Sequence, residues 1–431
     1  MAQKVKSIRG TRDVLPQESW KWKYVERVVM EVAATYGFGE IRTPTIEKTE
    51  LFVRSVGETT DVVQKEMYTF DMGRDSITLR PEGTAGVVRA VLENGMLGDA
   101  LPLKLSYILS CFRHERPQAG RYREFHQFGI ECFGAPSPSA DAEVIAVADA
   151  ILTRLEIPEV SLHINSIGCP NCRPAYNKRL VEYYRSHEEA LCELCKTRLE
   201  RNPLRLLDCK EPSCAALKDA APRSIDHLCG ECEEHFAGLQ TRLQALGLQY
   251  HVNPDIVRGL DYYTKTVFEF VTDKIGAQGT VCGGGRYDPL VEQMGGKPTP
   301  GLGFGMGLER LLLVMEAAGC EFPPEAPCDL YIGSMGEAEN IAALRLAHKL
   351  REEGFRVICD IMDRSVKAQM KYADKQRARF SCVIGSNELR AGKAAVKDMA
   401  GGTNTEVTLT PEALRAFLYQ TTLAQVAGSL E

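Results

Sequence analysis

Arginine side chains gather in one stretch of this chain, residues 79–131. Five of them are Arg80, Arg113, Arg116, Arg121 and Arg123. The planar guanidinium group matches two phosphate oxygens at once, so the cluster predicts a site for a phosphate-bearing anion. Carboxylates lie among the arginines and could hold a cationic or donor-rich group beside that anion.

Two apolar segments would position these arginines. Residues 107–109 and 125–130 are apolar enough to be strands on either side of a turn that contains Pro117 and Gly120. Upstream, residues 64–70 and 77–79 indicate strands, and residues 40–47 indicate a strand broken by proline. The spacing of valines predicts helices over residues 16–36 and 85–93.

Two glycine-rich segments lie further along the chain. Residues 281–288 contain three consecutive glycines, and residues 299–310 alternate glycine with apolar residues before a predicted helix. Glycine on a strand lets the backbone approach a flat ligand, and Arg310 in the first helical turn could point at a phosphate. Taken alone, the first segment indicates no more than a turn. The second fits a tight strand–helix contact equally well.

Several of these segments together resemble class II aminoacyl-tRNA synthetases. Arg113-x-Glu115 is typical of motif 2 of the class. Residues 299–310 resemble motif 3, and the helix and strand over residues 16–47 resemble motif 1. In this class motif 1 forms the subunit interface, so the resemblance implies a homodimer.

In detail the chain resembles the histidyl-tRNA synthetase family. Residues 80–84 and 120–131 are similar to the motif 2 region of those enzymes, and residues 257–264 and 281–288 resemble their two signature motifs. The resemblance implies a ligase that activates L-histidine with ATP and Mg²⁺ and transfers it to tRNA(His).

The family fold has three parts, which we expect here with the following bounds. Residues 1–325 should form an α+β catalytic domain on a mixed, mainly antiparallel sheet. Residues 168–240 should form a cysteine-rich insertion in it. Residues 328–431 should form an α/β anticodon-binding domain.

The resemblance also implies roles for individual residues. Arg113 and Arg258 are the implied catalytic residues. The implied histidine-binding residues are Glu82, Gly83, Thr84, Arg113, Gln127, Glu131, Arg258, Tyr262 and Tyr263. The implied ATP-binding residues are Arg113, Glu115, Arg121, Phe125 and Arg310.

One implied pair also has a physical rationale. Neutral imidazole offers one N–H donor and one acceptor nitrogen. A carboxylate such as Glu131 and a phenol such as Tyr263 would satisfy both.

The cysteine-rich stretch contains eight of the 15 cysteines. They occur as the pairs Cys169/Cys172, Cys192/Cys195, Cys209/Cys214 and Cys229/Cys232. Eight thiolates could hold two tetrahedral zinc ions. Reduced structural thiols are the alternative, and the sequence leaves both open.

Composition and the C-terminal pattern bound the remaining expectations. A chain of 431 residues predicts two or three domains, and a formal net charge of −6 gives no bulk signal for nucleic acid.

Residues 321–327 indicate a linker. The strands and helices that alternate after residue 329 predict a parallel sheet. Lys367, Lys371 and Lys375 fall on one helix face, where they could contact tRNA phosphates.

No secretory signal or membrane span is evident. No run approaches the roughly 18 apolar residues that a spanning helix needs. We therefore expect a cytoplasmic protein without membrane contact.

Two other functions are compatible with parts of the pattern. The histidine-sensing regulatory subunit of ATP phosphoribosyltransferase resembles this catalytic core but lacks the C-terminal domain. A prolyl or threonyl enzyme of the same class would lack the two histidine-type motifs.

Overall fold

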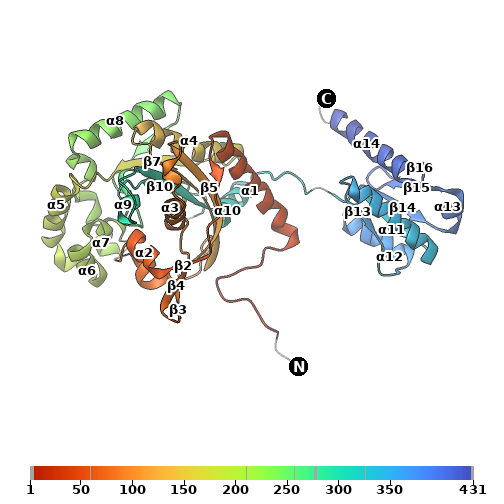
Figure 1. The fold of residues 1–431 in the computed structure, drawn as a ribbon, viewed down its shortest axis with the longest axis horizontal. Helices are drawn as coiled ribbons and strands as arrows, with labels where there is room; N and C mark the ends of the chain where they lie inside the picture. The colour runs from red at the N-terminus through yellow and green to blue at the C-terminus, as the bar shows by residue number, and fades with distance from the viewer. Residues whose placement is uncertain are drawn as a thin grey trace. The chain divides into compact units, whose positions relative to one another are not determined.

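A computed structural model describes residues 4–58, 60–209, 211–256, 258–275, 279–325 and 327–428. The chain divides into two compact units, Met1–Pro323 and Pro324–Glu431 (Figure 1). No helix in the described ranges is long and apolar enough to cross a membrane.

An eight-stranded sheet forms the centre of the first unit. Its strand order is β1-β5-β6-β11-β10-β9-β7-β8. The edge pairs β1–β5 and β7–β8 are parallel and the other five pairs are antiparallel, which confirms the expected mixed sheet. The strands are β1 (Gly39–Glu40), β5 (Leu103–Phe112), β6 (Glu124–Phe133), β7 (Ser161–Ser166), β8 (Tyr250–Val252), β9 (Thr264–Val271), β10 (Thr280–Arg286) and β11 (Gly301–Gly307).

Four helices bury one face of this sheet. Along β6 and β11, alternate side chains such as Phe128, Ile130, Phe304 and Met306 point to that face and are fully or almost fully buried. Period-2 alternation therefore leaves the opposite face of the same strands free for polar residues. The covering helices are α1 (Pro16–Thr35), α4 (Pro138–Arg154), α8 (Gly230–Ala245) and α10 (Leu308–Ala318).

The opposite face is only partly covered. Helix α3 (Thr84–Glu93) and the short α9 (Leu290–Gln293) pack there against Leu105, Tyr107 and Leu109 of β5. The glycine-rich segment 281–288 taken alone indicated a turn. Most of it is strand β10. The site lies on this face.

A small sheet stands beside the main one, in the order β2-β4-β3. Its strands are β2 (Ile46–Lys48), β3 (Tyr68–Met72) and β4 (Asp75–Leu79), and α2 (Thr49–Val56) packs nearby. The predicted strand over residues 64–70 is wrong in its first half, because Val62–Glu66 is a π-helical turn. The predicted strand over residues 40–47 is split into β1 and β2 by a segment that contains Pro44, which has no N–H for a ladder.

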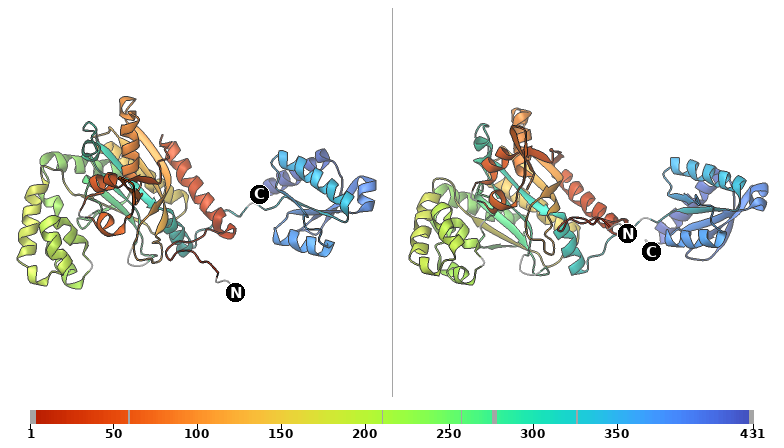
Figure 2. Two further views of the ribbon diagram at one scale, coloured as in Figure 1. Left: turned by 60° about the horizontal axis from the view of Figure 1, so that its bottom comes forward. Right: turned by 90° about the horizontal axis from the view of Figure 1, so that it is seen from below.

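The cysteine-rich stretch forms a helical lobe beside the sheet, yellow-green in Figure 2. It contains α5 (Arg173–Arg185), α6 (Glu193–Arg201), the 3₁₀ helix η4 (Pro203–Asp208) and α7 (Pro212–Ala215). Tyr176, Leu180, Tyr184 and Leu199 form its own buried core. Helix α8, which follows, contributes Phe236, Leu239 and Leu243 to the main core instead. The lobe thus consists mainly of residues 173–227.

The second unit has a five-stranded sheet in the order β13-β12-β14-β15-β16. Pairs β12–β13 and β12–β14 are parallel, whereas β15 and β16 pair antiparallel at one edge. Its strands are β12 (Leu330–Ser334), β13 (Val357–Cys359), β14 (Phe380–Ile384), β15 (Lys393–Asp398) and β16 (Asn404–Thr408). Its helices are α11 (Glu337–Glu352), α12 (Val366–Lys375), α13 (Ser386–Ala391) and α14 (Pro411–Gly428).

Candidate active site

Polar side chains of β6 lie on the sheet face where β11 carries glycine. Gly303 pairs with Glu131, and Gly305 lies two residues along the same strand. A methyl group on Gly303 would come within 2.2 Å of Glu131 Oε2, and one on Gly305 within 2.1 Å of Gln127 Nε2. Glycine is therefore required for these two side chains to lie across β11. Gly283 of β10 pairs with Gly305, so the glycine surface on which these side chains lie, here the glycine floor, extends from β11 to β10.

Glu131 is the most enclosed carboxylate of this face. It is 1% exposed and accepts hydrogen bonds at Oε1 from the hydroxyls of Thr84 (2.7 Å) and Tyr107 (2.9 Å). The hydroxyl of Tyr287 donates to Oε2. Burial raises the pKa of Glu131 to about 8, against the opposing effect of the three hydroxyls. The group can therefore change its charge near neutral pH.

Glu82 and Gln127 lie on the same face, and Glu82 is close to Glu131. The two carboxylate oxygens of Glu82 accept hydrogen bonds from the backbone N–H groups of Thr84 and Ala85, each at 2.8 Å, at the start of α3. Gly83 N donates to Gln127 Oε1 at 3.2 Å. Burial raises the pKa of Glu82, which the two N–H donors oppose. These contacts bring the predicted residues of motif 2 and of the 80–84 run together.

The two predicted tyrosines lie beside Thr84, Glu82 and Glu131. Tyr262 and Tyr263 are buried with their ring centroids 4.6 Å apart, and Tyr262 packs edge-on against Tyr287 at 5.6 Å. A methyl group on Gly285 would lie 3.1 Å from the Tyr263 ring, so Tyr263 also lies over β10.

Arg113 lies just beyond the end of β5, on the site face. Its Nε donates to the carbonyl of Pro81 at 2.9 Å, and its Cζ lies 5.4 Å from the centroid of the Phe125 ring. Its terminal nitrogens have no acceptor among the described residues. This arrangement fixes the guanidinium beside an aromatic ring while leaving donors for a ligand.

Arg121 and Arg310 form a cationic pair. Arg121 contacts Glu115 at 3.1 Å, and Arg310 Nη1 donates to the carbonyl of Thr280 at 2.7 Å. Burial and the neighbouring charge of Arg121 lower the pKa of Arg310. Two guanidinium groups held within electrostatic range favour an anion between them.

Arg258 lies over the β9–β10 side of the same face. It forms an ion pair with Glu269 of β9, and its Cζ lies 5.6 Å from the centroid of the Tyr263 ring. The hydroxyl of Thr280 donates to the second oxygen of Glu269 at 3.1 Å. Arg258 Nε is buried without a hydrogen-bond partner in the described ranges. A substrate oxygen anion would satisfy this donor, which costs about 1–3 kcal/mol when left unpaired.

The structure thus brings Arg113, Arg121, Arg258 and Arg310 to one face of the sheet. Arg80, by contrast, is 6% exposed, and its guanidinium donates to three backbone carbonyls, those of Ser110, Thr43 and Pro44. It fixes the backbone and does not add a donor to the cleft.

Sequence reasoning missed three residues that shape the site. Tyr107 and Tyr287 donate to Glu131, and Glu269 pairs with Arg258. The spacing of Leu105, Tyr107 and Leu109 gives a signal for Tyr107. Residues two apart on a strand lie on the same face, so the tyrosine lies with the two leucines on one face of β5, the strand that pairs with β6. Glu269 is the one charged residue in the apolar strand β9 apart from Lys265.

Comparisons with known proteins agree with this geometry. Residues 10–311 match the family described as histidyl-tRNA synthetase, and residues 330–419 match an anticodon binding domain. The histidine–tRNA ligase of Acetivibrio thermocellus is 55% identical over 402 residues, which cover 93% of this chain and 96% of the relative. That of Caldanaerobacter subterraneus subsp. tengcongensis is 54% identical over 406 residues, or 94% and 97% of the two chains. The solved apo histidyl-tRNA synthetase of S. aureus has a TM-score of 0.82 at 39% identity and covers 97% of this chain and 99% of its own.

The mixed sheet and the anticodon-binding unit are those of a class II aminoacyl-tRNA synthetase, an ATP- and Mg²⁺-dependent class. Within that class, the chain belongs to the histidyl-tRNA synthetase family. It is a ligase that charges tRNA with histidine, and the comparisons do not favour the regulatory paralogue considered above.

Proposed function

We propose that histidine is activated as its adenylate on the sheet face shared by β6, β11, β10 and β9. The histidine carboxylate attacks the α-phosphate of ATP and pyrophosphate leaves. A ribose hydroxyl at the 3′ end of tRNA(His) then takes the histidyl group and AMP is released. The observation that carries this proposal is the presence of four arginines on the sheet face that also carries the enclosed carboxylate of Glu131.

The arginines serve the phosphate chemistry. Arg113 contacts the α-phosphate, and Arg121 and Arg310 hold the β/γ end, while Phe125 stacks on adenine beside Glu115. Arg258 stabilises charge on the α-phosphate and binds the histidine carboxylate. In-line transfer of this kind depends on positioning and charge stabilisation more than on a nucleophilic side chain.

The remaining residues select histidine. Glu82, Thr84 and Gln127 take the amino group, and Gly83 keeps the backbone open beside it. Glu131 and Tyr263 bracket the imidazole, with Tyr262 packed behind. A methyl group on Gly83 would lie 2.5 Å from the Tyr107 ring, which supports a role for glycine there.

Mg²⁺ enters with ATP in this proposal. The ion binds through phosphate oxygens and one or two carboxylates. Glu66, which lies near Arg113 and Arg121, would supply a carboxylate. Burial raises the pKa of Glu66, and its neighbours include Arg113, Glu115 and Arg121.

A homodimer is the proposed assembly. The motif 1 region lies beside the small sheet, on which Ile46, Phe70 and Met72 are each more than half exposed. Apolar side chains gathered on one surface are typical of an interface. Sedimentation equilibrium would measure the mass, and a monomer at micromolar concentration would contradict the proposal.

The second unit is proposed to bind the anticodon region of tRNA(His) in the cytoplasm. Lys367, Lys371 and Lys375 are exposed on α12, opposite its buried residues Gln369 and Ala373. Lysine at phosphate contacts makes binding depend on salt.

The cysteine groups are proposed to hold structural Zn²⁺ and not a catalytic ion. Four thiolates fill a tetrahedral shell and leave no open position for a substrate. They also lie in the lobe and its base, and none of the eight is among the proposed substrate-binding residues.

Pyrophosphate exchange into ATP tests the proposal. We expect exchange that requires histidine and does not occur with proline or threonine. Binding of histidine without exchange would identify a regulatory protein and overturn the proposal. Exchange with proline or threonine alone would do the same.

A further inference from the structure

All 15 cysteines lie in the described ranges, and none is in a disulfide. Eight of them form two groups of four whose sulfur atoms all lie within 4.8 Å of one another within each group. The first group is Cys169, Cys172, Cys229 and Cys232. The second group is Cys192, Cys195, Cys209 and Cys214.

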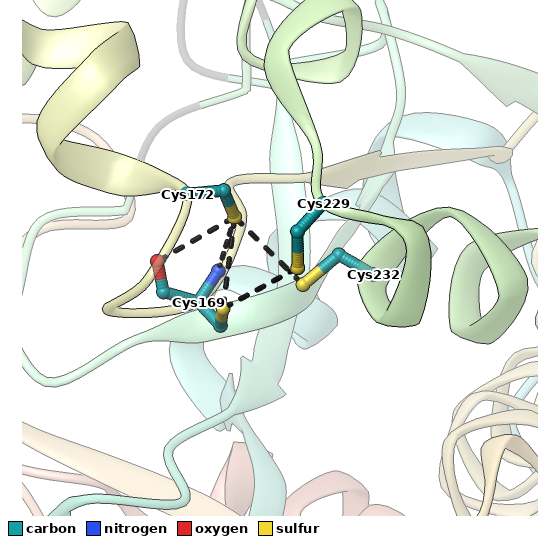
Figure 3. A group of neighbouring side chains, drawn as sticks. All are labelled: Cys169, Cys172, Cys229 and Cys232. Carbon is teal, nitrogen blue, oxygen red and sulfur yellow. Dashed lines mark hydrogen bonds between the residues drawn. The ribbon is translucent and has the colours of Figure 1, made fainter.

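The sulfur spacing in both groups fits a tetrahedral ion. Cys169 and Cys172 Sγ are 3.7 Å apart, Cys172 and Cys232 Sγ are 3.8 Å apart, and Cys169 and Cys229 Sγ are 3.8 Å apart. A Zn–S distance of about 2.3 Å in a tetrahedron gives sulfurs about 3.8 Å apart. Disulfide sulfurs would be about 2.05 Å apart. Figure 3 shows the four sulfurs of the first group turned toward one another.

The first group closes the base of the lobe. Cys169 and Cys172 precede α5, whereas Cys229 and Cys232 begin α8, 60 residues later in each pair. The second group brackets α6 and η4: Cys192 is the N-cap of α6 and Cys209 follows η4, with their sulfurs 3.9 Å apart.

Residues 198–205, here the docking segment, run from α6 into η4 and contact the catalytic core. Asn202 Nδ2 donates to Asp261 Oδ1 at 2.9 Å, and Arg205 donates to the carbonyl of Gly259. Arg198 forms a 2.9 Å ion pair with Asp61, which precedes the π-helical turn. The docking segment therefore holds the first half of residues 258–265, the Arg258 loop.

Neighbours of the first cysteine group hold the second half of the Arg258 loop. Arg173, next to Cys172, donates to the carbonyl of Tyr263 at 2.5 Å. Gly168, next to Cys169, accepts hydrogen bonds from Thr264 Oγ1 at 3.1 Å and from Lys265 N at 2.9 Å.

We propose that two Zn²⁺ ions, one on each cysteine group, brace the lobe so that the docking segment and Arg173 hold the Arg258 loop in its active conformation. The inference rests on the proposed roles of Arg258 and Tyr263. Zinc bound by four thiolates cross-links a small domain and adds to the stabilisation that its own core provides. Asn202, Arg205 and Arg173 are positioning residues in this account, since they reach substrate only through the Arg258 loop.

Zinc content tests the first half of the proposal. Full-length protein purified under reducing conditions should contain two zinc ions per chain by mass spectrometry. C195S and C229S should each contain one, and the control C320S, at a half-buried thiol outside both groups, should keep two. Zinc absent from the wild type, or unchanged in both variants, would overturn the proposal. These measurements need no substrate, so they do not depend on the aminoacylation activity.

The coupling to the loop has a separate test. We expect N202A/R205M to retain two zinc ions but to lose amide hydrogen-exchange protection at Asp261, whose N–H donates to Val56 O at 3.2 Å. Histidine-dependent pyrophosphate exchange should fall by up to about 10²-fold, the effect expected for a misplaced catalytic group. Protection in β6 should stay unchanged, which separates loss of the loop from general unfolding.

Combining the cysteine variant with the docking-segment variant tests whether zinc acts on the Arg258 loop through the docking segment or independently of it. If zinc acts through the docking segment, C195S/N202A/R205M should lose no more activity than the more impaired parent variant. Effects that multiply, or normal loop protection in C195S, would overturn the coupling. If the wild type itself shows no pyrophosphate exchange, the proposed function is contradicted. The zinc content and the amide hydrogen-exchange protection would then still test whether zinc stabilises the Arg258 loop.

Discussion

The hydroxyl of Thr84 donates a 2.7 Å hydrogen bond to Glu131 Oε1 across 47 residues of sequence. This contact joins the start of α3 to the C-terminal half of β6 and closes one side of the proposed imidazole pocket. The carboxylate is thereby held in one position before any substrate arrives, which is the condition for selective hydrogen bonding.

Loss of either imidazole partner should weaken histidine binding selectively. We expect E131A and Y263F to raise the KM for histidine by about 10- to 100-fold, because hydrogen bonds that involve charged groups contribute about 1.5–3 kcal/mol. The KM for ATP should change little. Steady-state pyrophosphate exchange measures both constants, and an unchanged histidine KM in both variants would refute the assignment.

The pKa of about 8 at Glu131 predicts a pH dependence. Below that pH Glu131 is mostly protonated in the free enzyme, and a neutral carboxyl group accepts a weaker hydrogen bond from the imidazole N–H than a carboxylate does. The value of kcat/KM for histidine should therefore rise with pH, by up to about tenfold per unit below pH 8, and level off above it. Rates measured between pH 6.5 and 9 would show the rise.

The variant E131Q provides the control, because an amide does not titrate in this range. Its kcat/KM for histidine should lack the rise toward pH 8. The kcat/KM for ATP in the wild type should lack it as well. A rise that persists in E131Q would have to come from another group.

Two glycines of β11 should tolerate no side chain. A methyl group at Gly303 or Gly305 would overlap Glu131 Oε2 or Gln127 Nε2, at 2.2 and 2.1 Å. We expect G305A to reduce histidine-dependent exchange by about 10²-fold through displacement of Gln127. G303A should reduce it at least as much, because its methyl group would also lie 2.1 Å from the backbone carbonyl oxygen of Ile130. At Gly307 of the same strand, the nearest atom to a methyl group is Arg310 Cβ at 3.8 Å, an ordinary contact.

The control G307A should therefore keep most of the activity. Circular dichroism would confirm that all three variants fold. Equal activity in G303A, G305A and G307A would show that the polar side chains across β11 do not need the glycine floor.

Much of this arrangement was predictable from the sequence, and the exceptions have physical causes. Strands β5 and β6 follow from their apolar residues. Strand β10 does not, because three consecutive glycines have low strand propensity and only its place between β9 and β11 makes it extended.

Residue types alone also could not separate structural from ligand-binding arginines. Arg80 and Arg113 both lie in the arginine-rich stretch, yet Arg80 is saturated by backbone carbonyls and Arg113 keeps free terminal donors among the described residues. The contacts of the docking segment with the Arg258 loop were equally out of reach, since residues more than 50 positions apart make them.

Arg258 should be essential for activation but not for folding. We expect R258A to lose about 10³-fold or more in histidine-dependent pyrophosphate exchange, by analogy with arginines that stabilise phosphoryl transfer elsewhere. The protein should stay folded and dimeric by sedimentation. Near wild-type exchange would remove Arg258 from the mechanism.

R258A has two consequences: it removes the guanidinium group from the substrate, and it removes the ion-pair partner of Glu269. A double variant separates them. R258A leaves Glu269 without its ion-pair partner, and E269Q removes the surplus charge. If the loss reflects missing transition-state stabilisation, R258A/E269Q should be as inactive as R258A. Recovery in the double variant would show instead that the unpaired carboxylate was the cause.

Arg80 should affect stability and not the chemistry. Its guanidinium donates to the carbonyls of Ser110, Thr43 and Pro44 and so joins β5 to the motif 1 segment. R80M would leave these acceptors unpaired, and each unpaired buried group costs about 1–3 kcal/mol. We expect a decrease of about 3 kcal/mol in the free energy of unfolding of the first unit.

Both tryptophans of the chain, Trp20 and Trp22, lie in α1, so their fluorescence during urea unfolding reports on that unit. R116M is the matched control, because Arg116 is exposed in the hairpin turn and should change the stability by less than about 0.5 kcal/mol. Under conditions where R80M is folded, its histidine KM should equal that of the wild type. A stable R80M with a raised KM for ATP would instead place Arg80 among the phosphate-binding arginines.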